Sequence, residues 1–213
     1  MNDLKFLLGQ IWQGKSTTRA FLNLELSKET LRGKIIDIGG GKNLDYVSFM
    51  TSENNCELRN FDIKAGETVD FEKDTLPLES NFYDTVLFLN VMEHIFNYQH
   101  IANEVVRVTK QGGQLIGFVP FLMWYHPDHS DYFRYTNEAL QKIFEGTSAS
   151  KVTIIPVHRG AFTAAGQMTL AWFPKALRIP IFVLLYGLDY FFVKYRPIYA
   201  HRYALGYLFK VEK

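Results

Sequence analysis

The residues best suited to bind a ligand follow a short apolar segment near the start of the chain. Asp37 lies within that segment, and the glycines Gly39, Gly40 and Gly41 follow it directly. Because glycine has no Cβ, the backbone there can approach a ligand closely. The third glycine of a dinucleotide-binding G-x-G-x-x-G turn is replaced by Leu44. A carboxylate before the glycines would repel a pyrophosphate but could hold an ammonium group, so the pattern favours a cationic ligand.

Further polar side chains follow the next expected strands. Asp62, which precedes Ile63 at the end of the second strand, can accept hydrogen bonds from both hydroxyls of a ribose. Asp70 and Phe71 end a short third strand, where an acid and an apolar ring could hold adenine. Asn90, directly after the fourth strand, is assigned to the same ligand. Together with the glycine turn, these residues predict a site for an amino-acid head, a sugar and a base.

The expected elements that position these residues alternate as in a doubly wound fold. Strands are expected at 34–38, 58–63, 69–71, 83–89, 115–119 and 152–155, with a final strand at 203–209 and helices at about 43–50, 97–110 and 137–144. This alternation favours an α/β fold with right-handed crossovers. We predict a Rossmann-like, mostly parallel seven-stranded sheet with an antiparallel last strand and a helical insertion before it. Residues 1–33 are expected to add helices in front of a domain spanning 34–213.

Taken together, these motifs resemble class I S-adenosylmethionine-dependent methyltransferases of the type 11 group. The acid-x-Gly-x-Gly turn runs from Asp37 to Gly41, and Asp62 matches the acid after the second strand. Further landmarks recur in order at 76–78, 82–86, 92–95 and 104–113. The resemblance covers roughly residues 34–155 and the last strand, and it implies S-adenosyl-L-methionine as the cofactor. Tyr83 interrupts the usual Phe-Asp pair, which we expect to alter packing rather than cofactor binding.

Histidines follow the fourth and fifth strands, at the edge where the methyl group should lie. His94 follows the fourth strand, His126 and His129 follow the fifth, and Asp131 could orient one of them. A hydroxyl acceptor needs a base of near-neutral pKa, which suits histidine. Alternatively, His94 is a capping or core residue that orients the cofactor loop together with Glu93. We predict no metal site, because methyl transfer does not require one and no family pattern supports it.

The segment 120–136 is expected to form the acceptor pocket or a lid over it. Its candidate substrate-binding residues are Trp124, Tyr125, Tyr132 and Arg134. Aromatic faces and a forked donor suit a sugar ring or a polar headgroup. Alternatively, the rings pack under the sheet edge while Arg134 pairs with Asp131. The segment also resembles bacterial methyltransferases of cell-surface glycan and lipid pathways, which implies a hydroxyl acceptor on a saccharide, a lipid-linked intermediate or a small molecule.

The insertion 160–202 combines many aromatic and basic residues with one acid, Asp189, between 170 and 202. Such a segment could serve as a core element, a homodimer contact, a lid or a membrane-surface anchor, with the core or dimer role ranked first. Its most apolar stretch, 179–188, ends at Asp189, well short of the ~20 residues that span a bilayer. We therefore expect no transmembrane helix, and prolines such as Pro180 predict short helical pieces.

Composition sets limits on the partners and the location of the protein. Its 23 lysines and arginines nearly balance 22 acids, so no nucleic-acid partner is expected. Because the chain has one cysteine and no recognisable signal peptide, we expect a cytoplasmic location, with peripheral contact at the inner membrane face as the alternative. Two other classes stay open: a non-catalytic cofactor-binding scaffold that uses 160–202 to bind a partner, and a nicotinamide oxidoreductase.

Overall fold

The computed structural model describes residues 3–41, 44–62, 69–127 and 130–213. Within these ranges the main sheet has six strands in the order β4-β2-β5-β6-β8-β7. Their bounds are β2 Lys34–Ile38, β4 Glu57–Phe61, β5 Tyr83–Leu89, β6 Thr109–Pro120, β7 Lys151–Val157 and β8 Gly206–Glu212. Strands β4, β2, β5 and β6 are parallel neighbours, and β8 runs antiparallel to both β6 and β7. The predicted α/β class and the antiparallel last strand are confirmed.

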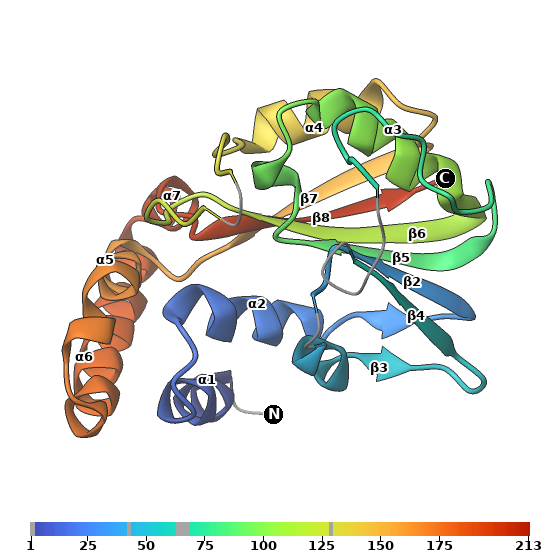
Figure 1. Cartoon of the computed structure of the whole chain (residues 1–213). Coiled ribbons are helices and arrows are strands. Elements are labelled where there is room, and N and C mark those ends of the chain that lie inside the picture. Colours follow the sequence, from blue (N-terminus) through green and yellow to red (C-terminus); the bar gives the residue numbers. More distant parts are fainter. Residues whose placement is uncertain (1–2, 42–43, 63–68, 128–129) are drawn as a thin grey trace.

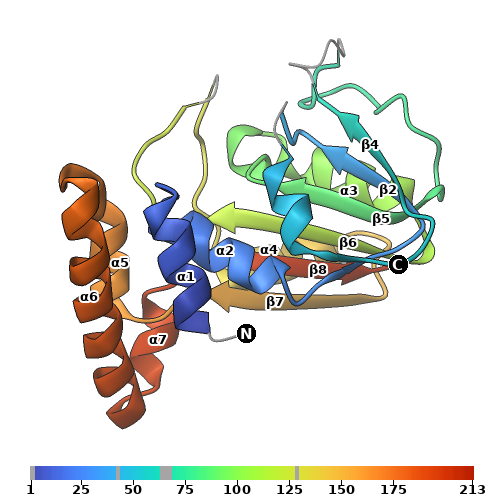
Figure 2. The ribbon, with the colours of Figure 1, turned by 90° about the horizontal axis from the view of Figure 1, so that it is seen from below.

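Helices cover both faces of this sheet, so the apolar side chains of the strands alternate between two cores (Figures 1 and 2). The helices are α1 Asp3–Trp12, α2 Thr17–Leu26, α3 Tyr98–Val108, α4 Asn137–Glu145, α5 Ala161–Thr169, α6 Lys175–Tyr195 and α7 Ile198–Arg202. Ile36 and Ile38 belong to the core under α3 and α4, whereas Ile35 belongs to the core that α1 and α2 cover. This period of two matches the pleat of a strand.

Short elements complete the frame. They are the strands β1 Thr30–Leu31 and β3 Thr51–Ser52, which pair in parallel, and the 3-10 helices η1 Asp45–Phe49, η3 Met92–His94 and η4 Leu170–Trp172. The α-helix expected at 43–50 is therefore a shorter 3-10 helix in its described part.

The strand expected at Val69–Phe71 is absent, because these residues form a loop and a turn. The Asp70 carboxylate accepts the backbone N–H of Glu72 at 2.9 Å, and the Asp70 N–H donates to Asp74 Oδ2 at 3.0 Å. Aspartate side chains that bond nearby backbone groups compete with a strand ladder. The sheet consequently has six strands within the described residues instead of the seven expected.

The insertion contains one long helix, contrary to the expectation of short pieces. Helix α6 runs for 21 residues through Pro180. A proline this close to a helix start removes one backbone hydrogen bond, to the carbonyl four residues earlier. Helix α6 is long and apolar enough to cross a membrane, with a mean hydropathy of 1.7 in its most apolar window and 11% of that window buried. The expectation that no segment reaches that length is wrong.

Asp189 does not end the apolar helix, because its charge is turned inward. The side chain is 1% exposed and accepts hydrogen bonds from Phe162 N at 2.9 Å, Thr163 N at 2.8 Å and Thr163 Oγ1 at 2.7 Å. These donors lie at the first turn of α5, where free N–H groups and the helix dipole favour a carboxylate. Asp189 thereby joins α5 to α6 as a helical hairpin, residues 161–195.

We predict that Asp189→Ala lowers the free energy of unfolding by about 2–4 kcal/mol, since it leaves buried donors at the start of α5 without their acceptor. Urea denaturation followed by circular dichroism measures the change. Glu79→Ala, which removes an exposed loop carboxylate, is the control and should stay within about 0.5 kcal/mol of wild type. Equal effects of the two substitutions would contradict this role.

Candidate cofactor and acceptor site

The glycine bend after β2 is fixed to the neighbouring strands. Gly39, with φ +77°, donates its N–H to Phe61 O at 2.8 Å, and Gly41, with φ +69°, donates its N–H to Asp62 Oδ2 at 2.8 Å. A Cβ on Gly39 would lie 2.6 Å from a methyl group of Val91. The bend therefore needs glycine for its left-handed angles and for its close contact with the residues after β5.

Asp37 lies beneath this bend and is fully buried. The Tyr46 hydroxyl donates a hydrogen bond to its Oδ2, and a Cβ on Gly40 would collide with the same oxygen. Burial raises the pKa of Asp37 to about 6, against the hydrogen bond from Tyr46 and with help from the charge of Asp62. The two acids thus lie near one bend as expected, but Asp37 is covered, and its direct contact with an ammonium group stays a prediction.

The surroundings of the bend are compatible with the predicted polar ligand. A Cβ on Gly41 would meet no atom of the described residues within 4 Å, so none of these residues covers the outer side of the bend. Asp37 Oδ1 is a buried acceptor without a hydrogen-bond partner among the described residues. Asp62 is 6% exposed, and Asn60 Nδ2 steadies the bend by donating to Gly41 O at 2.6 Å. Open backbone beside buried acceptors is what a ligand with ammonium and hydroxyl groups requires.

The other predicted cofactor residues divide between the core, a turn and a cavity. Phe71 is 8% exposed and stacks on Phe61 with ring centroids 6.4 Å apart. Asp70 bonds within its own turn and pairs with Lys73 at 3.0 Å, and the bond to the Glu72 N–H lowers its pKa. Asn90 follows β5 with φ +56° and lines a cavity. Ile63 lies outside the described residues.

That cavity, of about 320 Å³, opens at the carboxyl ends of β5 and β6. Ligands of open α/β sheets bind at this edge. The lining residues are Ser16, Thr18, Arg19, Leu22, Asn90, His94, Phe118, Pro120, Met123 and His126. Sequence reasoning missed the contribution of α2 and its cap, which were expected only to pack before the sheet. The placement of α2 is set by tertiary packing, and no local motif indicated it.

Two of the predicted histidines meet over a buried acid. His94 and His126 have ring centroids 5.3 Å apart, and their Nε2 atoms lie 3.8 and 3.9 Å from Glu93 Oε1. The Glu93 side chain is 0% exposed, and its carboxylate raises the pKa of His126 above the usual value. Sequence reasoning gave Glu93 only an orienting role, although an acid beside His94 after a strand was a usable signal. His129 lies outside the described residues.

Arg134 pairs with Asp131, which matches the alternative stated for it. The two nitrogens of its fork lie 2.5 and 2.7 Å from the carboxylate oxygens, and this bidentate pair lowers the pKa of Asp131 to about 2. Asp131 also accepts the N–H of His126 at 2.9 Å, so the pair fixes the backbone that carries this histidine. Trp124 and Tyr125 are 43% and 73% exposed and do not line the cavity.

Tyr132 is 48% exposed and has its ring against Phe96, with centroids 5.4 Å apart. It does not line the cavity either. Acceptor binding by Trp124, Tyr125, Tyr132 and Arg134 therefore stays a prediction.

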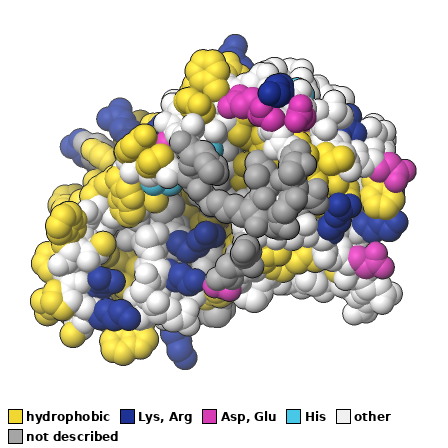
Figure 3. All heavy atoms as spheres, viewed as in Figure 1, with side chains coloured by type: hydrophobic (Ala, Val, Ile, Leu, Met, Phe, Trp, Pro, Cys, Tyr) yellow, Lys and Arg dark blue, Asp and Glu magenta, His cyan; other side chains and the backbone are white. Residues whose placement is uncertain are grey.

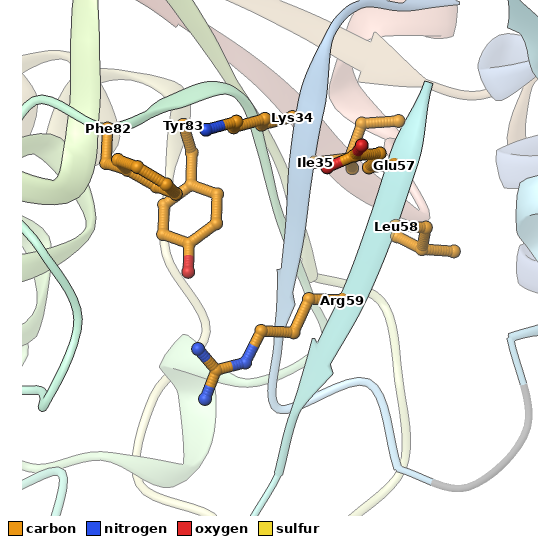
Figure 4. A pocket seen from close by; sticks show the side chains of 7 residues that line it. All are labelled: Lys34, Ile35, Glu57, Leu58, Arg59, Phe82 and Tyr83. Carbon is orange, nitrogen blue, oxygen red and sulfur yellow. The ribbon is translucent and has the colours of Figure 1, made fainter. Parts of the chain in front are cut away.

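A second cavity, of about 330 Å³, opens at the amino ends of β2, β4 and β5. Figure 4 shows the Arg59 and Tyr83 side chains extending into the space between β4 and the segment before β5. The Lys34 ammonium lies over the ring of Phe82, 4.1 Å from its centroid, so this cation already has a partner within the protein. This end of the sheet lies opposite the glycine bend, so the two cavities are separate sites.

Comparison with known proteins identifies the class. Residues 39–117 match the family described as a methyltransferase domain. These residues therefore form a methyltransferase domain, in agreement with the resemblance to class I S-adenosylmethionine-dependent methyltransferases. A demethylmenaquinone methyltransferase of Bacillus cereus (strain AH187) is 26% identical over 117 residues, a match that covers 54% of this chain and 49% of that protein. The chain therefore spans about half the length of the curated relatives it matches.

Solved structures share the fold of this methyltransferase domain at low identity. Phosphoethanolamine N-methyltransferase 2 of Haemonchus contortus, in complex with S-adenosyl-L-methionine, has a TM-score of 0.54 and 14% identity over 90% of this chain and 52% of that chain. The [4+2]-cyclase SpnF has a TM-score of 0.50 and 12% identity over 92% of this chain and 81% of that chain. Because SpnF is named a cyclase, the fold alone does not define the chemistry, which must be argued from the site.

The buried Asp37 should give the methyltransferase domain a measurable pH dependence. With its pKa raised from 3.8 to about 6, the folded state binds more protons than the unfolded state between these values, so stability falls as pH rises through this window. Asp37→Asn removes this titration. The unfolding free energy of wild type minus that of the variant should fall by about 1–3 kcal/mol from pH ~4 to pH ~7, measured by urea denaturation. Parallel pH profiles would refute the raised pKa.

Proposed function

We propose that this protein binds S-adenosyl-L-methionine at the glycine bend and methylates an acceptor held in the cavity at the ends of β5 and β6. The observation that carries the proposal is that the glycine bend and the cavity lie at the same edge of the sheet. The bend that Asp62 holds lies at the carboxyl edge of the parallel strands, as does the cavity lined by Asn90 and His94, and no described residue lies against the outer side of Gly41. A cofactor and an acceptor bound at these places would be neighbours, as group transfer requires.

The residues of the chain serve mainly to bind and align. When bound, the cofactor supplies an electrophilic methyl group, so the protein has to contribute position more than reactivity. We assign Asp37, Gly39, Gly40, Gly41, Asp62, Ile63, Asp70, Phe71 and Asn90 to the cofactor side. A hydroxyl acceptor must lose its proton as it attacks, and the candidate groups for that step are His94, His126 and His129, with Asp131 holding the backbone of His126.

The acceptor that we propose is a hydroxyl of a saccharide, a lipid-linked intermediate or a small molecule. A cavity of about 320 Å³ holds a group of that size, and Ser16, Thr18 and Asn90 offer it polar contacts. Trp124, Tyr125, Tyr132 and Arg134 would bind parts of the acceptor that extend beyond the cavity. A nitrogen acceptor is the alternative outcome, since one structural neighbour is named an N-methyltransferase.

We expect Asp62→Ala to weaken binding of S-adenosyl-L-methionine at least about tenfold, because a charged acceptor at the bend is lost. His129→Ala should keep the affinity and lose rate. Calorimetry with the cofactor and its demethylated product measures affinity, and mass spectrometry of incubated acceptor pools measures turnover. Binding of NAD with no response to either sulfur ligand would reject the assignment, and cofactor binding without turnover of any pool would favour the scaffold.

We also propose that the α5–α6 hairpin docks on the surface of an anionic membrane. Its outward apolar residues are Trp172, Leu177, Val183, Leu184, Tyr190, Phe191, Phe192 and Tyr195, each at least 42% exposed. Basic side chains lie at both ends of α6, and the acid Asp189 is buried. Figures 1 and 2 place the hairpin at one end of the molecule, and Figure 3 shows apolar and basic side chains there. Rings with cations at their margin suit the headgroup region of anionic lipid.

Liposome flotation tests the docking face. Neutralising Lys175, Arg178, Lys194 and Arg196 to glutamine should lower the partition into anionic vesicles at least about tenfold, given roughly 1 kcal/mol per cation near such a surface. A matched control neutralises the exposed lysines Lys28, Lys73, Lys110 and Lys151 and should float like wild type. Equal recovery of all three proteins with the vesicles would contradict membrane docking. A homodimer that does not bind vesicles would instead assign this face to contact with a second copy of the chain.

A further inference from the structure

Three potential metal ligands converge at the edge of the sheet where the cavity opens. One ligand atom from each of Glu93, His94 and His126 lies within 4.8 Å of the other two. Glu93 and His94 belong to η3, which follows β5, and His126 lies in the segment after β6. In the part of the chain that the structure describes, no other group of three or more His, Cys, Asp or Glu side chains is this close.

The carboxylate of Glu93 lacks the partners that a buried charge needs. Its side chain is 0% exposed, and neither oxygen has a hydrogen-bond partner among the described residues. The N–H groups of Tyr132 and Phe133 bond the carbonyl of Glu93, at 2.9 and 3.3 Å, and not its carboxylate. Arg134 lies nearby, but its fork is committed to Asp131. A buried carboxylate normally has a close donor or cation, and the nearest ring nitrogens, of His94 and His126, lie 3.8 and 3.9 Å away, beyond hydrogen-bond distance, so the carboxylate has room for a closer positive partner between them.

Both imidazoles are oriented as metal-binding histidines are. Nδ1 of His94 bonds the carbonyl oxygen of Ser130, and Nδ1 of His126 bonds the carbonyl oxygen of Trp124 at 3.0 Å. A carbonyl only accepts, so an Nδ1 that donates to it leaves the Nε2 lone pair for an ion, although Nδ1 of His126 also lies 3.3 Å from Nη2 of Arg134. Those Nε2 atoms are the ones that lie 3.8 and 3.9 Å from Glu93 Oε1. A backbone acceptor on the far nitrogen is the usual support of a metal-bound histidine.

We propose that Glu93, His94 and His126 bind a divalent transition-metal cation of the Zn²⁺ or Fe²⁺ type. Two imidazoles and one carboxylate are typical ligands of such ions, whereas Mg²⁺ and Ca²⁺ favour oxygen alone. Bonds of about 2.0–2.2 Å to a common ion would place the ligand atoms about 3.0–3.6 Å apart. The three ligand atoms lie within 4.8 Å of one another, with 3.8 and 3.9 Å from the histidines to Glu93 Oε1, so the side chains must move closer together to reach that geometry.

Three protein ligands leave coordination positions open, and two of the three, His94 and His126, line the cavity. The consequence for catalysis rests on the proposed methyl transfer. A hydroxyl bound to the ion would release its proton to solvent at a lower pH than a free hydroxyl, and its oxygen would keep the electron pair needed for attack. His94 and His126 would then act through the ion instead of as free bases, and acceptors with an oxygen able to bind the metal would be preferred.

Metal titration of the whole chain tests the site without reference to activity. After treatment with a chelator, wild type should bind one Zn²⁺ per chain in calorimetry, and Co²⁺ should give a visible absorption band that reports nitrogen ligands. Glu93→Gln keeps the shape of the side chain and should weaken the binding of Zn²⁺ and of Co²⁺ at least about tenfold. His201→Gln is the matched control, because His158 and His201 form a second histidine pair with ring centroids 5.2 Å apart, and it should bind Zn²⁺ like wild type.

Circular dichroism and S-adenosyl-L-methionine calorimetry on Glu93→Gln establish that the variant is folded. No saturable binding of Zn²⁺ or Co²⁺ to wild type below about 1 mM, or wild-type affinity in Glu93→Gln, would overturn the metal site. Loss of the metal site with cofactor binding and turnover intact would leave the methyl-transfer proposal in place. Saturable metal binding by a chain that does not bind S-adenosyl-L-methionine would support the metal site and contradict the methyl-transfer proposal.

Discussion

The pinned glycine bend after β2 is the constraint on which the arrangement of the site depends. Two backbone N–H groups, from Gly39 and Gly41, bond Phe61 O and the Asp62 carboxylate, so the bend cannot move independently of β4. Beneath it, Asp37 is buried with the Tyr46 hydroxyl as its donor. Because side chains larger than glycine would strike Val91 or Asp37 at positions 39 and 40, close packing keeps the backbone at the sheet edge. The cavity beside it is shaped from the same edge.

Buried carboxylates recur in this protein, and their different surroundings suggest different roles. Asp189 has three donors at the start of α5, and Asp131 has a bidentate arginine, so both are satisfied and hold elements together. Asp37 has one hydrogen-bond donor, on Oδ2, and its Oδ1 has none among the described residues. Neither carboxylate oxygen of Glu93 has a hydrogen-bond donor among the described residues. Unsatisfied polar groups in a folded protein are costly, and they concentrate where a ligand or ion supplies the missing partner. Of these two incompletely satisfied acids, Asp37 lies near the end of β2, and Glu93 follows β5. Both therefore lie toward the carboxyl edge of the parallel strands.

Local sequence patterns predicted the parts of the fold that local physics decides. The apolar runs of β2, β5 and β6 and the glycines after Asp37 gave the parallel sheet, its edge and the class of domain. The strand at Val69–Phe71 failed because the Asp70 side chain bonds the backbone of its own turn. Helix α6 was missed because the charge of Asp189 is balanced by a helix distant in sequence, a compensation that no window of residues reveals. The burial of Glu93 and the position of α2 at the cavity are likewise products of tertiary packing.

In the proposed function the glycine bend, and not another cavity, receives the cofactor. Amide resonances measured by nuclear magnetic resonance during titration with S-adenosylhomocysteine test it residue by residue. We expect the amides of Gly41 and Asn90 to shift and saturate together, while those of Glu57 and Leu58, at the cavity on the opposite edge, stay unchanged. Saturable shifts at Glu57 and Leu58 with none at Gly41 would contradict the claim.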